Sequence, residues 1–403
     1  MSKSLRSLLK QRDFTLLLAG QFVSKLGSGI NGIGLTLYVM KFENPILGLG
    51  TLMLLLHIPW LMFGPLAGTL ADRYSKKSII IMCDILRGIF GILLFYSNSL
   101  VGFYAIVLLI TTLDVLFSPA VGSFLPFIVA KDELEEANSV YSASGEVARL
   151  IGPALGGTLV ALLGTSSVFL INGISYILSG ISETFICDKG ISASQREKQS
   201  TLDDITEGIQ YTKHHKRMGF IIIFFAFDSV ALGGVPIAYL NFIRHDLMTS
   251  EALYGLFMTI NGIGYLVGSL LVPRLQTTWT KLELMIKGTG VYGFFLVLFA
   301  LFKFMPYNML LFFLLGVVAS LVNVSYSIFL QQEVAKDMIG RVYSLDMALS
   351  TITGMLSIIL ITLLGDRLSN TTLILLFAGI TILISLYGQT KIEALEQETE
   401  DNS

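Results

Sequence analysis

The chain has 403 residues, of which 53% are hydrophobic and only 14% are charged, and its mean hydropathy is +0.73. Because a soluble globular domain carries about 25% charged residues, this composition excludes a soluble protein and predicts one that lies in a lipid bilayer. The net charge of −2 excludes an electrostatic surface for nucleic acid, and Cys83 and Cys187 lack the spacing of a metal or redox site.

Twelve apolar stretches follow one another along the chain. A helix needs about 20 residues to cross a hydrocarbon core of about 30 Å, and each stretch is close to that length. Residues 1–12 are polar and basic, and the apolar run after them is long enough to be a true span, so no cleavable signal peptide is expected. We predict transmembrane helices over residues 14–39, 47–70, 78–97, 100–122, 139–163, 166–186, 218–242, 252–273, 283–302, 307–330, 341–364 and 371–389.

The basic residues predict an orientation for these spans. With both termini in the cytoplasm, 20 of the 27 Lys and Arg residues fall in the predicted inner segments. The outer loops hold only Lys41, Arg244, Lys303 and Arg367. Because an excess of Lys and Arg marks cytoplasmic loops, we expect both termini to lie inside the cell. We expect the protein to be a monomeric, multi-pass protein of the bacterial inner membrane.

A long polar interruption divides the spans into six and six. Within it, Leu202, Ile205 and Ile209 fall on one face of a predicted helix. Such a helix is expected either at the cytoplasmic membrane interface or as a solvated linker. We predict an all-α membrane protein with two six-helix bundles, and divide the chain into residues 1–187, the linker 188–217, residues 218–390 and a cytoplasmic tail, 391–403.

An internal repeat supports this division. The stretch Val129-Ala-Lys-Asp132 recurs as Val334-Ala-Lys-Asp337, and a Val-Tyr-Ser stretch recurs further on, at residues 140–142 and 342–344. Both copies join the fourth span of their half to the fifth. Parallel repeats of six spans are typical of one transporter architecture, so the two bundles are expected to be pseudo-symmetric.

The turn between the second and third spans has an unusual composition. Residues 68–77 read Gly-Thr-Leu-Ala-Asp-Arg-Tyr-Ser-Lys-Lys. They resemble the signature loop of the major facilitator superfamily, with Ser75 where a second glycine usually stands. Glycine lets helices approach closely, and an acid in such a turn can face the positive N-terminus of another helix.

This resemblance implies a cytoplasmic gate in which the acid of the turn faces a helix that begins near Arg341. The alternative is that the basic turn reflects membrane topology alone. Asp346 is a candidate partner of the gate, whose motif residues are Gly68, Asp72, Arg73, Lys76 and Lys77.

The fifth span carries a second motif, which resembles the glycine–proline motif of drug–proton antiporters in the same superfamily. Its residues are Gly145, Gly152, Pro153, Gly156 and Gly157. Glycine removes side-chain bulk, and proline bends a helix, so a simple packing face is the alternative interpretation. The surrounding residues 117–164 resemble the macrolide-efflux and siderophore-exporter branch, which favours export over import.

Several ionisable residues fall inside predicted spans, where a charge normally faces a cavity or a partner. Asp84 and Arg87 lie three residues apart and are expected to form a structural ion pair. Glu146 and Arg149 have the same spacing and the same interpretation, with the transport cavity as the alternative.

Asp114 has no partner three or four residues away on its own helix. It is expected either to pair with Lys25 of the first span or to act in proton coupling or substrate binding. The same two roles are open for Asp228 in the seventh span. The fourth span lacks the arginine found in many proton antiporters, so that residue's role does not carry over.

We therefore predict a secondary active transporter that exports macrolide-like or other amphiphilic compounds, with protons as the coupling ion. The alternatives are export of one endogenous product, such as a siderophore or peptide antibiotic, and a membrane sensor or scaffold that transports nothing. No nucleotide-binding run of the form G-x-x-x-x-G-K-[ST] occurs. No catalytic residue, cofactor or metal site is predicted, so an intramembrane enzyme is disfavoured.

Overall fold

The computed structural model describes residues 8–42, 44–130, 133–187, 201–335, 338–365 and 367–392. Side chains of residues 65, 66, 68, 69, 71–73, 201–205 and 208 lie outside this description. Within the described ranges all regular structure is helical. The chain forms two compact units, which are taken separately below.

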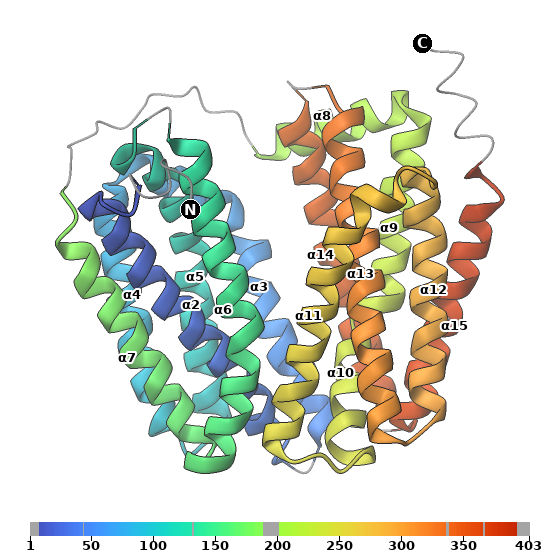
Figure 1. The fold of residues 1–403 in the computed structure, drawn as a ribbon, viewed down its shortest axis with the longest axis horizontal. Coiled ribbons are helices and arrows are strands. Elements are labelled where there is room, and N and C mark those ends of the chain that lie inside the picture. Colours follow the sequence, from blue (N-terminus) through green and yellow to red (C-terminus); the bar gives the residue numbers. More distant parts are fainter. Residues whose placement is uncertain are drawn as a thin grey trace. The chain divides into compact units, whose positions relative to one another are not determined.

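The first unit comprises Met1–Glu43, Thr51–Glu197 and Ser250–Thr259. In this unit α4 packs against α5 and α7, and α2 packs against α6 and α7 (Figure 1). Its helices are α2 (Arg12–Val39), α3 (Pro45–Arg73), α4 (Lys76–Phe95), α5 (Leu100–Ile128), α6 (Leu134–Leu163) and α7 (Thr165–Thr184).

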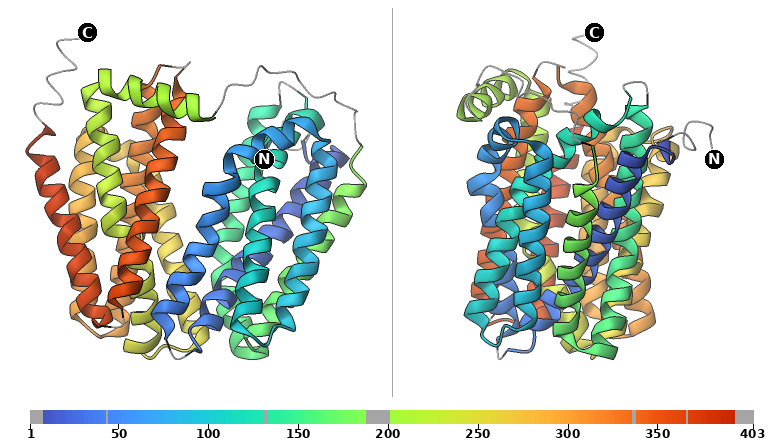
Figure 2. Two further views of the ribbon diagram at one scale, coloured as in Figure 1. Left: turned by 180° about the vertical axis from the view of Figure 1, so that it is seen from behind. Right: turned by 90° about the vertical axis from the view of Figure 1, so that its left-hand side faces the viewer.

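The second unit comprises Asn44–Gly50, Lys198–Thr249 and Ile260–Ser403. Here α12 packs against α13 and α15, and α9 packs against α14 and α15 (Figure 2). Its helices are α8 (Thr201–His214), α9 (Lys216–Leu232), α10 (Val235–Asn241), η1 (Phe242–Asp246), α11 (Glu251–Leu275), α12 (Lys281–Leu301), α13 (Met305–Glu333), α14 (Ile339–Leu364) and α15 (Asn370–Gln389). The start of α11, up to Thr259, belongs to the first unit, and the start of α3, up to Gly50, belongs to the second.

Eleven helical segments of the described chain are long and apolar enough to cross a membrane. Segments α9, α10 and η1 form one of them, Lys216–Asp246. The predicted first span, α2, has 28 residues but is not among the eleven. Polar residues and glycines replace apolar ones along its buried face, including Gln21, Ser24 and Asn31, and this lowers its hydropathy.

The helix pattern of the first half recurs in the second. Helices α12, α13, α14 and α15 begin 205 residues after α4, α5, α6 and α7, respectively. The repeated Val-Ala-Lys-Asp stretch starts at the end of a helix in both places. Val129 ends α5 and Val334 ends α13, and each has an extended backbone and a buried side chain. Val129 and Val334, which open the two copies, therefore have the same local structure.

The polar linker contains the predicted helix as α8, which packs against α14 in the second unit. A 2.8 Å ion pair joins Glu207 to Arg341, and the backbone N–H of Ala335 donates to Tyr211 Oη at 3.1 Å. Ile209 of the predicted apolar face is 38% exposed, while the side chains of residues 202 and 205 lie outside the description. Within the described side chains, Glu207 holds α8 to the second unit through an ion pair, and Tyr211 does so through a hydrogen bond and apolar packing.

Candidate functional site

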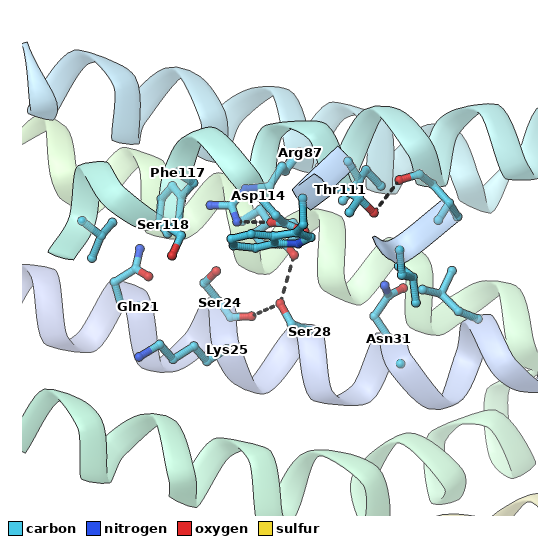
Figure 3. Close-up of a pocket in the computed structure, with 18 of the residues that line it drawn as sticks. Gln21, Ser24, Lys25, Ser28, Asn31, Arg87, Thr111, Asp114, Phe117 and Ser118 are labelled. Atoms are coloured by element: carbon cyan, nitrogen blue, oxygen red, sulfur yellow. Dashed lines mark hydrogen bonds and ion pairs between the residues drawn. The ribbon is translucent and has the colours of Figure 1, made fainter. Parts of the chain in front are cut away.

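A cavity of about 650 Å³ lies within the first unit, bounded by residues of α2 to α7. Polar side chains of α2 form one wall, and α5 contributes Thr111, Asp114 and Ser118 opposite them (Figure 3). Apolar and aromatic groups, among them Trp60 and Phe117, complete the lining. Pockets of this size and character suit drug-sized ligands.

The sequence of α2 explains its polar wall. Residues three and four apart lie on one face of a helix, and the polar residues of α2 follow that spacing. They are Gln21, Ser24, Lys25, Ser28 and Asn31, all of which line the cavity. This polar face of α2 would be unfavourable against lipid, and in the structure it lines an internal cavity instead.

Arg87 of α4 lies at the centre of the charged groups beside the cavity. Its Nη1 is 2.6 Å from Asp114 Oδ1, and its Nη2 forms an ion pair with Asp84. The guanidinium carbon lies 3.8 Å from the centre of the Phe117 ring and 4.5 Å from that of Tyr176. Aromatic faces and carboxylates thus stabilise one buried cation from several sides.

The structure places the predicted intramembrane charges as follows. Asp84 and Arg87 form the expected pair. Asp114 pairs with Arg87 across two helices rather than with Lys25, because α5 packs against α4. The Lys25 ammonium instead lies 3.7 Å from the centre of the Tyr141 ring. Asp114 keeps a 34% exposed side chain, so the cavity still reaches it.

Glu183 of α7 is a buried acid that the sequence interpretation missed. Its side chain is 1% exposed, and its Oε1 accepts a 2.8 Å hydrogen bond from Gln21 Nε2. The same amide nitrogen lies 3.4 Å from Asp84 Oδ2 and 3.2 Å from Ser179 Oγ. We call Asp84, Arg87, Asp114 and Glu183 the acidic network, because it contains three carboxyl groups and one guanidinium.

A sequence signal for Glu183 does exist. Asn172, Tyr176, Ser179 and Glu183 follow helical spacing along α7, and all four are at most 4% exposed. A polar stripe on one face of an otherwise apolar helix marks an internal surface. The stripe predicts that its last member, an acid, faces inward.

The glycine–proline motif of α6 contacts α2. A Cβ added at Gly152 would lie 2.8 Å from Gly29 Cα, and one at Gly156 would lie 2.8 Å from the Ile30 carbonyl oxygen. Gly157 faces the first turns of α11, which belong to the same unit. A Cβ added at Gly157 would lie 2.9 Å from the Cα of Gly255. These glycines therefore permit close helix crossings.

The remaining motif members lie elsewhere on α6. A Cβ at Gly145 would lie 2.9 Å from the Lys25 ammonium, and Pro153 lies inside the helix. Glu146 and Arg149 form a 2.7 Å ion pair whose side chains are 57% and 52% exposed. That pair is separate from the acidic network.

The proposed gate turn is described only in part. The side chains of Gly68, Asp72 and Arg73 lie outside the description, although α3 continues to residue 73. Ser75, the departure from the family pattern, caps α4 by accepting the backbone N–H of Ser78 at 3.3 Å. The departure thus supplies a helix cap.

The lysines of this turn contact the first unit itself. Lys77 Nζ donates to the carbonyl oxygens of Thr184 and Ile186, at 3.0 and 2.7 Å. A cation is favourable at the end of a helix, and here it ties the turn to the end of α7. Lys76 Nζ lies 5.5 Å from the centre of the Phe127 ring. A gating role for the turn stays a prediction.

In the second unit, two predicted acids have different surroundings. Asp346 of α14 accepts a hydrogen bond from the Tyr326 hydroxyl. Asp228 of α9 is 8% exposed, and its Oδ1 has no hydrogen-bond partner in the described structure. Within the described residues, neither acid has an ion pair with a cation.

The long apolar helices, the repeated helix pattern and the polar cavity define a multi-pass membrane transporter. A family model described as "Transmembrane secretion effector" matches residues 4–403. The chain therefore belongs to this family of the major facilitator superfamily.

The chain is also similar to several bacterial transporters. It is 27% identical over 368 residues to the uncharacterized MFS-type transporter YfiS of Bacillus subtilis, which covers 86% of this chain and 85% of the relative. It is 22% identical to macrolide efflux protein A of Streptococcus pyogenes, with 93% and 94% of the two chains covered. The Staphyloferrin A transporter of Staphylococcus aureus is 24% identical, with 64% and 66% covered.

Solved structures share the fold at lower identity. A variant of the nucleoside transporter NupG superposes with a TM-score of 0.74 at 15% identity, covering 94% of this chain and 99% of that one. A bacterial homologue of the iron transporter ferroportin gives a TM-score of 0.72 at 16% identity, covering 95% and 98%. These similarities place the chain among bacterial membrane transporters and support a location in the cell membrane.

Proposed function

We propose that this transporter exports bulky amphiphilic compounds, such as macrolides, in exchange for protons that move inward. The observation that carries the proposal is the cavity of the first unit, where Asp114 is exposed beside aromatic and apolar groups. An apolar lining suits a varied hydrophobic body, and a carboxylate suits an amine or another cation. The similarity to macrolide efflux protein A supports this substrate class.

Protons are a suitable energy source for such an exporter. One proton moving down a potential of 100 mV releases about 2.3 kcal/mol, and each pH unit adds about 1.4 kcal/mol. A hundredfold gradient costs about 2.8 kcal/mol, and moving a monovalent cation outward against 100 mV adds about 2.3 kcal/mol, so two protons suffice. The acidic network contains more carboxyl groups than cations, and a mobile proton can change that balance.

The proposal includes the twelve-helix arrangement. Helix α2 would be the twelfth span, because it packs against α6 and α7 inside the first unit and has sufficient length. Both termini would then lie in the cytoplasm, as the distribution of Lys and Arg favours. The bundles would be residues 1–187 and 218–390, with the chain acting as a monomer.

A second candidate is a dedicated exporter of a carboxylate-rich product such as a siderophore. Lys25 favours it, because its ammonium lies beside the cavity on the Tyr141 ring and forms no ion pair within 4 Å in the described structure, although Glu146 is close enough to attract it. The similarity to the Staphyloferrin A transporter supports the same idea. The two candidates differ in the charge of the compound bound.

Everted membrane vesicles with an acid interior test both candidates and the non-transporting alternative. A macrolide, a cationic dye or a siderophore is added outside, and a pH-sensitive dye reports the interior. We expect cationic amphiphiles to raise the interior pH, and vesicles without the protein to stay unchanged. A response to siderophores alone would favour the second candidate, and no response to any compound would contradict proton-coupled export.

Asp114→Asn gives the residue-level test of this proposal. We expect the variant to lose proton flux by tenfold or more, which corresponds to a rise of about 1.4 kcal/mol in the activation free energy of transport. Glu135→Gln, on an exposed turn of α6, is the matched control and should transport normally. Wild-type flux in Asp114→Asn would remove this residue from the mechanism.

A further inference from the structure

Glu183 lies in surroundings that an ionised carboxylate does not favour. It is 1% exposed, and no ion pair involves it within the described residues. Its Oε1 accepts from Gln21 at 2.8 Å and from Ser179 at 3.4 Å, while its Oε2 is buried without any hydrogen-bond partner. A buried charge without a cation is strongly disfavoured.

The donors around this acid are too few for the acceptors. The Gln21 amide has two N–H groups, yet its nitrogen faces Glu183, Asp84 and Ser179. The Ser179 hydroxyl has one proton to donate. Arg87 serves Asp84 and Asp114, so one additional proton would supply the missing donor.

The remaining titratable groups of the packed helices do not supply a cation to Glu183. Helix α4 contributes Cys83, a buried free thiol, beside Asp84 and Arg87. It also contributes Lys77, whose ammonium donates to the carbonyl oxygens of Thr184 and Ile186 and forms no ion pair with Glu183 in the described structure. Helix α6 contributes Tyr141, whose ring carries the Lys25 ammonium of α2. Helix α7 itself contributes Tyr176, whose hydroxyl lies 3.0 Å from Ser28 Oγ.

We propose that Glu183, linked to Asp84 through the Gln21 amide, is an internal proton-binding site that is separate from the substrate-facing Asp114. The proton and a cationic substrate compete through Arg87, which contacts both sides of the network. This inference rests on the proposed exchange of protons for cationic substrate and specifies where the proton resides.

The competition follows from charge balance. When Glu183 carries the proton, Arg87 pairs with both Asp84 and Asp114, in the contacts that the structure shows, and the network keeps one net negative charge. A substrate cation at Asp114 weakens the contact of that acid with Arg87, so the guanidinium moves toward Asp84 and Glu183. The positive charge of Arg87 then lowers the affinity of Glu183 for its proton. The O–H bond of the Glu183 carboxyl breaks, the proton goes to water, and the resulting carboxylate pairs with Arg87.

Infrared spectroscopy of the purified full-length protein in lipid nanodiscs tests the site without a substrate. We expect wild type at neutral pH to show the carbonyl stretch of protonated carboxyls, to which the buried Asp228 also contributes, and Glu183→Gln to lose one component of that absorption. Glu135→Gln, the exposed control, should keep the band. Carbonyl absorption of unchanged intensity in Glu183→Gln would overturn the proposal. Loss of the Glu183 component when NaCl replaces KCl at constant pH would also overturn it, because that result would assign the site to sodium.

Proton release on ligand binding tests the competition. The probe is tetraphenylphosphonium, a bulky amphiphilic cation, and its binding is followed by Trp60 fluorescence in a Trp279→Phe background, since the chain has two Trp residues. We expect the background protein to release about one proton per bound probe. Glu183→Gln should bind the probe and release far fewer protons.

The outcomes separate this inference from the proposed function. If Glu183→Gln binds the probe and releases as many protons as its background, the inference is wrong although the cavity remains. If the background protein does not bind the probe, the proposed cation-binding cavity fails, and the infrared band alone decides whether Glu183 holds a proton. Ser179→Ala is a control for disruption of the local fold. It removes a neighbouring hydrogen-bond donor but leaves the Glu183 carboxyl in place, so the band should remain.

Discussion

The two halves of the chain repeat one helix pattern but differ in where they carry charge. The first unit encloses the acidic network. At the spacing of 205 residues that relates α4, α5 and α7 to α12, α13 and α15, the four positions are occupied by Thr289, Tyr292, Ala319 and Gly388. None of these residues carries a charge.

The neutral residues at the equivalent positions of the second unit are closely packed. Thr289 is 1% exposed, and its hydroxyl donates to the Met285 carbonyl of its own helix at 3.0 Å. At Gly388 an added Cβ would lie 2.8 Å from both Ile286 and Phe224 side chains. The fold therefore does not require charge at these places, and the expensive charges of the first unit are best explained by transport.

Replacing Arg87 should break this comparison most severely. In Arg87→Met, the three carboxyl groups of the network lose their cation, and removing one partner of a buried ion pair costs about 3–5 kcal/mol. We expect a large fall in the thermal unfolding midpoint of the detergent-solubilised protein. Tyr292→Met, at the equivalent position of the second unit, should cost less.

Comparing Arg87→Met with Tyr292→Met separates loss of the buried cation from the general cost of a substitution at this position. A melting curve of Arg87→Met that superposes on wild type would mean that the network does not stabilise the first unit. Arg87→Lys keeps the charge but not the forked donor geometry, so it should melt between wild type and Arg87→Met.

Eleven of the predicted spans were recognisable because each is a long apolar run with polar or glycine-rich ends, whereas α2 is less apolar along its buried face. The predicted 100–122 and 341–364 begin within two residues of α5 and α14. Helix ends were less accurate where polar residues continue a helix beyond the membrane. Helix α6 starts at Leu134 rather than near residue 139, because Glu135 and Glu136 favour a helix N-terminus.

The charged site was less predictable because pairing across helices depends on packing. Spacing along one helix was sufficient for Asp84 and Arg87. The partner of Asp114 was not evident, since Lys25 and Arg87 are both basic residues on neighbouring spans and only the packing of α4 on α5 distinguishes them. Glu183 was missed because it lies in the last turn of its helix, where an acid ordinarily faces water.

The glycine–proline motif offers a smaller contrast between the halves. Gly152→Ala should be destabilising by about 1–3 kcal/mol, because its Cβ would meet the Gly29 backbone, which cannot rotate away. Gly354 of α14 has open space where its own Cβ would lie. Gly354→Ala should therefore be neutral or stabilising by up to about 1 kcal/mol.

Thermal unfolding of the two alanine variants checks this prediction, and everted-vesicle flux shows whether the α2–α6 crossing also matters for transport. Equal melting temperatures for the two variants would mean that the crossing relaxes at little cost. The motif would then need an explanation other than close packing.

Replacing Asp228 should have the smallest effect on the unfolding midpoint, and it tests the comparison in the second unit. It is the buried acid of α9, with an unpartnered Oδ1 and no ion pair in the described structure. Asp228→Asn replaces a carboxyl group that has no cation to stabilise its ionised form, so the unfolding midpoint should stay unchanged or rise, with a free-energy change within about 1 kcal/mol. Asp84→Asn in the first unit should lower the midpoint instead, because it removes a partner of buried Arg87. If Asp228→Asn were the more damaging of the two, the second unit would contain a polar network of its own around Asp228, and charge would no longer distinguish the halves.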